Sequence, residues 1–400
     1  MSADRPTIRK KVFLDANVLD AALDRIRYCF ASFDKVVVSF SGGKDSTALL
    51  NLTVKVAREL GRLPVHAIFF DEEAIHPPTI EYVERVRART DEVRLDWYCL
   101  PVKHRNACSN ESPWWYCWHP EEREKWVRPM PERVITEHPE FKFGMSFQEF
   151  SDVMFTRADG TVGMLDGVRT QESFRRMKAV STRRHDNYIS AAVGYGAVKK
   201  AHPIYDWSSE DVWTLVNKWG IDYNRTYDVF NRTDLFNRLL TQRVCPPFGE
   251  EPLRGLWLYA ECFPEMWHKM LARCPGVATA WRYSNTELYG VGKLTKPDEL
   301  TWQEFCDVVI DQYSGKDRTA VRENVESLVR RHKEKTPDAI PDTGEHPLTG
   351  MSWEFLTKII LKGDFKGRTA PKLENAAITV RKKLGIESYE EAKKIWGHKR

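Results

Sequence analysis

The chain has 400 residues, a net charge of +4, 42% hydrophobic and 30% charged residues, values typical of a globular protein rather than a disordered one. This length suggests two or three domains. No apolar run reaches the about 20 residues that a membrane span needs, and the start, MSADRPTIRKK, lacks the apolar segment of a secretion signal. Eight scattered cysteines favour a reducing compartment over a disulfide scaffold. We therefore expect a cytoplasmic protein without a membrane segment.

Strands and helices are expected to alternate over the first hundred residues. The hydrophobic patterns predict a leader helix within 1–34, strands at 35–40, 64–70 and 94–100, and helices at 45–60 and 77–89. This alternation predicts an α/β fold with a doubly wound parallel sheet. In such sheets, ligands bind at the carboxyl ends of the strands.

The segment SFSGGKDST, Ser39–Thr47, lies between the first of these strands and the helix that follows it. Gly42 and Gly43 allow a tight turn and close approach of the backbone to a ligand. A helix N-terminus binds phosphate through its amides and dipole, and Lys44 adds a full positive charge. A plain glycine turn is the alternative, but every residue type here suits anion binding. The spacing differs from that of a Walker loop.

SGGKDS resembles the PP-loop of the adenine nucleotide alpha-hydrolase superfamily. The resemblance implies that the loop holds the pyrophosphate part of ATP. It also implies that a nucleophile attacks the α-phosphate.

Two further groups follow predicted strands and are expected to share the pocket of this loop. Asp71, Glu72 and Glu73 end the strand at 64–70. A second motif, DGVRTQES at 166–173, follows a strand predicted at 162–165. In it Gly167 allows close approach, and the planar Arg169 side chain suits phosphate or sulfate.

The remaining sequence suggests the domain organisation. Residues 101–160, rich in Trp, Pro, Cys and His, are interpreted as an insertion over the pocket, and 161–206 as a return to the sheet with a helix starting at 171–179. HPIYDW at 202–207 predicts a strand and a turn before a capped helix at 208–219. Residues 245–400 are expected to be mostly helical. We therefore expect a nucleotide-binding domain at 1–243 and a helical domain at 244–400.

Three motifs in this order, SGGKDS, GVRTQES and PIYDWSSEDVW followed by DYNRTYD, resemble the phosphoadenosine phosphosulfate reductase family. They are also similar to the small subunit of ATP sulfurylase and to DNA-phosphorothioation sulfurtransferases. The resemblance covers about residues 30–250. The stretches NACSNESPWWYCW and VCPPFGEEPLRGLWLY are similar to the IbrA/YbdN-type branch, which extends the resemblance over most of the chain.

The resemblance implies an adenine nucleotide alpha-hydrolase-like, Rossmann-like fold and a set of site residues. The expected nucleotide-binding residues are Ser39, Ser41, Gly42, Gly43, Lys44, Asp45, Ser46, Asp71, Gly167 and Arg169. Among them Lys44, Asp45 and Arg169 are the expected catalytic residues. Asp45 is also the candidate ligand for Mg²⁺, which prefers oxygen.

Departures from the family favour ATP as the substrate. The chain lacks the Glu-Cys-Gly-Leu-His ending whose Cys attacks the sulfonate, and it lacks the cysteine pairs of the iron–sulfur members. Its phosphate loop is intact and keeps Lys44. We expect attack at the α-phosphorus by a sulfate, carboxylate or carbonyl oxygen of an acceptor substrate, with release of pyrophosphate. The alternative is a reductase or sulfotransferase that uses phosphoadenosine phosphosulfate and a thiol.

A group of cysteines and histidines lies near the start of the insertion. The candidate ligands for zinc or an iron–sulfur cluster are Cys108, Cys117, His119 and Cys245. No spacing matches a common zinc knuckle, so plain structural residues and a catalytic, persulfide-carrying thiol stay open as alternatives. The nearby Trp114, Trp115, Trp118 and Trp126 either stack on a base or substrate ring or belong to the core.

The last fifty residues carry twelve basic and six acidic side chains, a net charge of +6. Such a tail indicates contact with DNA or an acidic protein, or a solvated helical face. The resemblance to IbrA-type proteins implies a third function, a nucleotide-binding regulator that works with a ParB-like partner.

Overall fold

The computed structural model describes residues 15–398 apart from 110, 173–179, 181–187, 191–197, 234–243, 247, 249–254, 285–295, 314, 362–369 and 387. The chain divides into two compact units, Met1–Val102 with Met130–Asp228, and Lys103–Pro129 with Val229–Arg400. The expected domain boundary after residue 243 falls at the edge of a stretch outside the described residues. Most of the helix expected at 171–179 also lies outside them.

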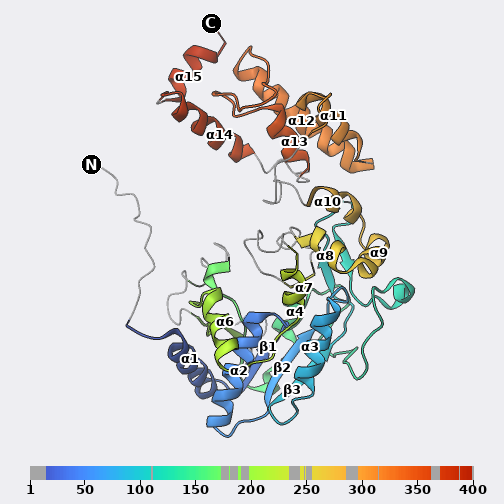
Figure 1. Ribbon diagram of the computed structural model, residues 1–400, viewed down its shortest axis with the longest axis vertical. Helices are drawn as coiled ribbons and strands as arrows, with labels where there is room; N and C mark the ends of the chain where they lie inside the picture. Colours follow the sequence, from blue (N-terminus) through green and yellow to red (C-terminus); the bar gives the residue numbers. More distant parts are fainter. Residues whose placement is uncertain are drawn as a thin grey trace. The chain divides into compact units, whose positions relative to one another are not determined.

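The first unit is built on a five-stranded parallel sheet with the order β3-β2-β1-β6-β7 (Figure 1). Its strands are β1 (Lys35–Ser39), β2 (Val65–Phe70), β3 (Val93–Tyr98), β6 (Val162–Leu165) and β7 (Val198–Ala201). The expected doubly wound α/β fold is confirmed. Because all five strands run the same way, the residues that follow β1, β2 and β6 meet at one edge of the sheet.

Helices surround this sheet (Figure 1). They are α1 (Val18–Ser32), α2 (Lys44–Glu59), α3 (Pro77–Arg87), α4 (Phe147–Val153), α6 (Ser209–Lys218) and α7 (Thr226–Asn231). Four of them, α1, α2, α3 and α6, lie close to the predicted positions, whereas α4 and α7 were not predicted. Buried Leu49, Leu52 and Val56 form one apolar face of α2. A capping box of Ser208 and Asp211 fixes the start of α6. The strand expected at HPIYDW instead ends at Ala201, and the residues from Pro203 form a turn, because a proline cannot donate to the ladder.

The second unit is mostly helical, as expected for the C-terminal region (Figure 1). A short antiparallel hairpin, β4 (Lys103–Arg105) with β5 (Trp114–Tyr116), comes from the insertion and was not predicted. The helices are α8 (Leu256–Cys262), α9 (Pro264–Arg273), α10 (Val277–Ser284), α11 (Trp302–Asp311), α12 (Gly315–Lys335), α13 (Trp353–Leu361), α14 (Ala370–Lys383) and α15 (Tyr389–Trp396). Buried Phe305, Val309, Val325 and Ile360 join α11, α12 and α13.

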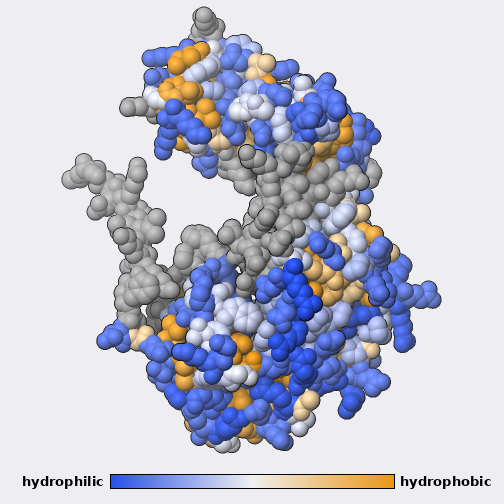
Figure 2. Space-filling model, in the orientation of Figure 1, coloured by the Kyte–Doolittle hydropathy of each residue, from blue (hydrophilic) through white to orange (hydrophobic). Residues whose placement is uncertain are grey.

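The surface is largely hydrophilic, with separate apolar patches (Figure 2). One patch lies over α14 and α15, where Leu384 and Ile395 are more than half exposed. In the described part of the chain, no helix combines the length and the apolar character needed to cross a membrane.

Candidate functional site

The loop between β1 and α2 has the shape that its glycines allow. Gly43 stands just before the first residue of α2, Lys44. Gly42 has a φ of +71°, and a Cβ on it would lie 3.0 Å from Thr79 Cγ2 on α3. Both its left-handed backbone and the close approach of α3 therefore require glycine at this position.

Two serines hold the loop in a closed turn. The Ser41 backbone N–H donates to Ser46 Oγ at 3.2 Å, and the two hydroxyl oxygens lie 3.0 Å apart. Ser46 Oγ also donates to the Gly43 carbonyl at 3.0 Å. Ser41 is exposed and Ser46 is buried. The hydroxyl groups predicted to bind phosphate thus also bind one another, which preorganises the loop.

A segment far along the chain supports the same loop. The Lys44 backbone N–H donates to Tyr227 Oη at 3.0 Å. Asn224 Nδ2 donates to the Gly42 carbonyl at 3.0 Å and to Thr79 Oγ1 at 2.8 Å. Asn224 and Tyr227 are both buried. The sequence interpretation assigned them no role, although both belong to the DYNRTYD motif that contributed to the family resemblance.

One carboxylate, that of Asp45, connects the two cations of the site. Lys44 Nζ lies 2.9 Å from Asp45 Oδ2, and Arg169 Nε lies 2.6 Å from Asp45 Oδ1. Lys44 and Arg169 are only 3% and 2% exposed. A second carboxylate, that of Glu172, lies 4.0 Å from Arg169 Nη2, so the two buried cations are largely balanced by acidic neighbours. Both cations nevertheless lie close to the start of α2, where the helix dipole is positive.

Further contacts fix the orientation of the Arg169 guanidinium. Its Nη1 donates to the Trp207 carbonyl at 3.3 Å and to Gln171 Oε1 at 3.1 Å. Its Nη2 donates to Ser209 Oγ at 3.3 Å. The side chain is therefore held in one position by the residues around the start of α6.

Gly167 brings the loop after β6 against the first turn of α2. A Cβ on Gly167 would lie 2.9 Å from the Ser46 backbone nitrogen and 3.0 Å from the Asp45 carbonyl carbon. These are backbone atoms of a helix and cannot move aside. The absence of a side chain at this position is what allows Arg169 to reach Asp45.

Asp71 lies at the same edge of the sheet, but both of its carboxylate oxygens bind within the protein. Oδ1 accepts the Glu73 backbone N–H at 3.0 Å, and Oδ2 accepts the Trp97 indole N–H at 2.9 Å. Asp71 is 1% exposed and Glu73 is fully buried with a φ of +58°. The hydrogen bond from Trp97 therefore connects the residue that follows β2 to β3.

The expected metal ligands lie in the second unit. Among the described residues, no group of three or more His, Cys, Asp or Glu side chains is arranged to hold a metal ion. His119 Nδ1 accepts the Glu121 backbone N–H at 3.2 Å, and Cys245 is exposed. The thiol of Cys274 is hydrogen-bonded to Cys108, which together with burial raises the pKa of Cys274. The metal assignment stays a prediction.

The tryptophans of the insertion differ in their surroundings. Trp115 and Trp118 are buried at 4% and 1% exposure and form part of the core. Trp126 packs edge-on against Trp118, with ring centroids 5.1 Å apart. Trp114 is 45% exposed and lies beneath two cationic side chains of β4. Trp114 is therefore the member of the group best placed to meet a partner.

Comparisons with known proteins agree with this architecture. The family model of the phosphoadenosine phosphosulfate reductase domain matches residues 35–233, and that of a domain of unknown function, DUF3440, matches 238–343. The chain is 31% identical over 372 residues to the Escherichia coli protein YbdN, covering 89% of this chain and 90% of YbdN. The chain therefore belongs to the phosphoadenosine phosphosulfate reductase family, in the branch that includes YbdN.

More distant similarities cover smaller parts of the chain. A Methanocaldococcus jannaschii protein, MJ0066, is 26% identical over 58% of this chain and 40% of its own length. Among solved structures, phosphoadenylyl-sulfate reductase from Candida auris in a phosphate complex matches 52% of this chain and 84% of that chain, with 15% identity and a TM-score of 0.31. Candida glabrata FMN adenylyltransferase in complex with ATP matches 52% and 57%, with 13% identity and a TM-score of 0.32.

Proposed function

We propose that the first unit binds ATP, with its phosphates against the loop at 39–46, and catalyses attack on the α-phosphorus by an acceptor substrate. The observation that carries this proposal is the buried cluster of Lys44, Asp45 and Arg169 at the start of α2. It combines a glycine turn, a helix N-terminus and two cations at the ligand-binding edge of a parallel sheet.

The residues of the cluster suit a polyphosphate chemically. Asp45 already positions both Lys44 and Arg169, so an incoming phosphate would meet two fixed cations that offset its negative charge. When the phosphates bind Lys44 and Arg169, the carboxylate oxygens of Asp45 become available for Mg²⁺, which prefers oxygen ligands. A bound Mg²⁺ would neutralise charge on the phosphate oxygens.

The reaction that fits this site is nucleotidyl transfer. An oxygen of the acceptor donates an electron pair to the α-phosphorus, the bond from that phosphorus to the bridging oxygen breaks, and pyrophosphate leaves with the bonding pair. Lys44 and Arg169 then stabilise the charge that develops on the leaving group. The preorganised loop and the fixed guanidinium limit the rearrangement that this stabilisation needs.

The cysteines support ATP over a thiol-dependent reaction on phosphoadenosine phosphosulfate. Both cysteines of the first unit, Cys29 and Cys99, are buried. Burial raises the pKa of Cys262 to about 11 and that of Cys306 to about 12, which disfavours the nucleophilic thiolate. Cys245 is exposed and is the thiol best placed for the reductase alternative, which ranks below nucleotidyl transfer because most of the other thiols are buried. The regulator with a ParB-like partner or DNA is a separate alternative on which the cysteines do not bear.

Calorimetry with Mg²⁺ and either ATP or phosphoadenosine phosphosulfate, together with an assay of pyrophosphate release, tests the proposal. Lys44→Ala is expected to lower both ATP affinity and pyrophosphate release by about 100-fold or more. Lys55→Ala is the matched control, because Lys55 lies on the same helix and pairs with Glu59 at the surface. Wild-type ATP binding by Lys44→Ala would contradict the proposal. A preference for phosphoadenosine phosphosulfate with thiol-dependent sulfite release would replace it with the reductase.

A further inference from the structure

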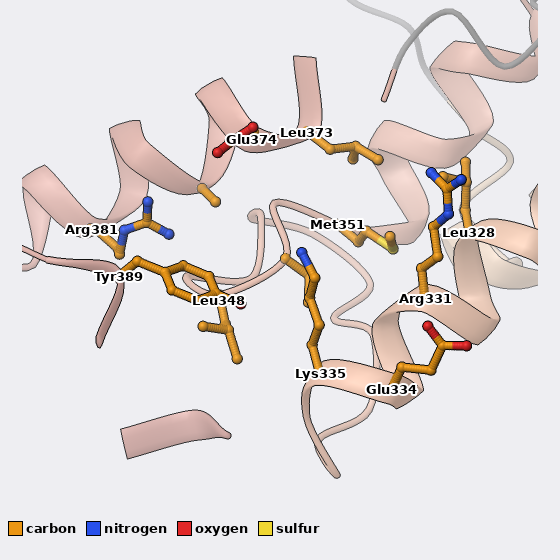
Figure 3. Close-up of a pocket in the computed structure, with 12 residues that line it drawn as sticks. Leu328, Arg331, Glu334, Lys335, Leu348, Met351, Leu373, Glu374, Arg381 and Tyr389 are labelled. Carbon is orange, nitrogen blue, oxygen red and sulfur yellow. The ribbon is translucent and has the colours of Figure 1, made fainter. Parts of the chain in front are cut away.

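The second unit contains a cavity of about 340 Å³ between α12, α14, the start of α15 and the loop at 346–351 (Figure 3). Its size lies within the range of about 300–1,000 Å³ usual for small-molecule sites. Nothing in the proposed reaction uses it. Its walls hold three cationic side chains, two carboxylates and an apolar surface, as follows: Leu328, Arg331, Glu334, Lys335, Leu348, Thr349, Met351, Leu373, Glu374, Ala377, Arg381 and Tyr389.

Arg381 on α14 is the central polar group of this cavity. Its side chain lines the cavity, yet the residue is only 8% exposed. Its Nη1 donates to the Pro347 carbonyl at 3.0 Å, and the guanidinium lies 5.7 Å from the centroid of the Tyr389 ring. Within the described parts of the chain it forms no ion pair with a carboxylate. A buried guanidinium with one carbonyl partner retains donors for an anion.

Two further cations, from the end of α12, line the same cavity. Lys335 lies between Arg381 with Tyr389 on one side and Arg331 on the other (Figure 3). Lys335 Nζ lies 6.0 Å from the centroid of the Tyr389 ring. Among the residues that the structure describes, neither Arg331 nor Lys335 pairs with a carboxylate, although Glu334 and Glu374 also line the cavity. The cavity therefore favours an anion.

Most of the apolar lining residues come from the loop at 346–351 and from α14, and these two segments are firmly held together. A Cβ on Gly350 would lie 1.8 Å from the Leu373 carbonyl oxygen, so the loop at 346–351 packs directly against α14. The Gly350 backbone N–H donates to the His346 carbonyl at 2.7 Å, and buried His332 Nδ1 lies 2.7 Å from Thr349 Oγ1. A preformed wall of this kind binds a rigid apolar group at low entropic cost.

We propose that this cavity binds a small organic phosphate, with the phosphate group on Arg381 and Lys335 and an apolar or planar body against Tyr389 and the leucine wall. Three cations outnumber the two carboxylates, which favours a doubly charged phosphate. Of the three cations, Arg381 is buried inside the hollow, where a small molecule reaches it more readily than the backbone of duplex DNA does.

Calorimetry on the full chain tests this proposal with three probes: AMP, inorganic phosphate and uncharged adenosine. The protein carries Lys44→Ala, so that the site in the first unit is weakened and the result does not depend on the proposed reaction. AMP is expected to bind at millimolar or lower concentration. It should bind more tightly than inorganic phosphate, because its base also packs against the apolar wall. Adenosine is expected to bind far more weakly than AMP.

Variants of the cationic residues locate the binding. Lys335→Gln and Arg381→Gln are each expected to weaken AMP binding about tenfold or more. Lys333→Gln is the matched control, because Lys333 lies on the same helix but lines a different groove. Lys335→Gln removes an exposed side chain, so it tests the site even where Arg381→Gln fails to fold.

Three results would overturn the proposal. The first is that neither AMP nor phosphate binds at millimolar concentration, or that any such binding is unchanged by Lys335→Gln. The second is that adenosine binds as tightly as AMP, or inorganic phosphate as tightly as AMP. The third is that Lys333→Gln and Lys335→Gln weaken binding equally and both abolish salt-sensitive binding of a DNA duplex, which would indicate a general basic surface.

Discussion

Arg169 and Asp45 are 124 positions apart in the sequence, and Arg169 Nε donates to Asp45 Oδ1 at 2.6 Å. This contact joins the loop after β6 to the first turn of α2. It exists because β6 pairs directly with β1, with Val38 in register with Leu165. The site is therefore complete only when the two motifs, which lie on either side of the insertion, meet across neighbouring strands.

Replacing Arg169 by lysine is expected to lower the free energy of unfolding by about 1–3 kcal/mol and to weaken nucleotide binding. A lysine cannot reach Asp45, Trp207 and Ser209 at once. Urea unfolding and calorimetry with ATP measure the two effects. Arg157→Lys, at an exposed arginine of the same unit, should change neither. Unchanged stability in Arg169→Lys would show that the planar side chain is not needed there.

Alanine at two glycines of the site is expected to act in different ways. In Gly167→Ala the new Cβ meets backbone atoms of α2 at 2.9 and 3.0 Å, which should cost about 1–3 kcal/mol of stability. In Gly43→Ala the nearest atom lies 3.5 Å away, an ordinary contact. Gly43→Ala should therefore fold normally but bind ATP less tightly, because its Cβ enters the space beside the loop.

Thermal unfolding and ATP binding of the two variants together check this difference. Equal losses of stability in both would mean that the close approach at Gly167 is not what holds the β6 loop in place.

The stability of the second unit is expected to fall below neutral pH because of His332. Burial lowers the pKa of this ring, which is also close to His346 and bonds to the Asp338 carbonyl at 3.0 Å. The unfolded chain, with a histidine pKa of about 6.5, binds the proton more readily than the folded one. The free energy of unfolding should thus decrease as the pH falls from about 6.5 toward the lower folded-state pKa.

Urea unfolding between about pH 5 and pH 8 measures this dependence. His332→Gln should reduce the slope, whereas His268→Gln, at an exposed histidine, should leave it unchanged. A wild-type slope in His332→Gln would assign the dependence to other groups.

The cysteines are expected to differ widely in reactivity. Cys245 is exposed and should be alkylated first by iodoacetamide, while the fully buried Cys117, Cys274 and Cys306 should be protected in the folded protein. Mass spectrometry of peptides after increasing labelling times measures the order. Rapid labelling of Cys117 or Cys274 would contradict it and would revive a thiol-dependent reaction.

Sequence patterns predicted the elements around the site more fully than its contacts. The strand at 35–39, the glycine turn and the helix from Lys44 follow from β-branched residues, glycines and helical spacing, all local in the chain. The partners Asn224 and Tyr227 were not assigned because a hydrogen bond to a loop more than 180 positions away leaves no periodic signal. Asp71 was placed at the correct edge, but its bonds to Trp97 and Glu73 depend on how β2 and β3 pair.

By itself the sequence determined the α/β class, the glycine turn before α2 and the family, because these depend on residue types at short spacings. Only the tertiary structure decided that Asp45 forms ion pairs with both Lys44 and Arg169 and that Gly167 must lack a side chain. It also decided that Arg381 lies buried in a cavity with Lys335. Burial and charge pairing arise when distant segments exclude water together, and a linear sequence does not record which segments those are.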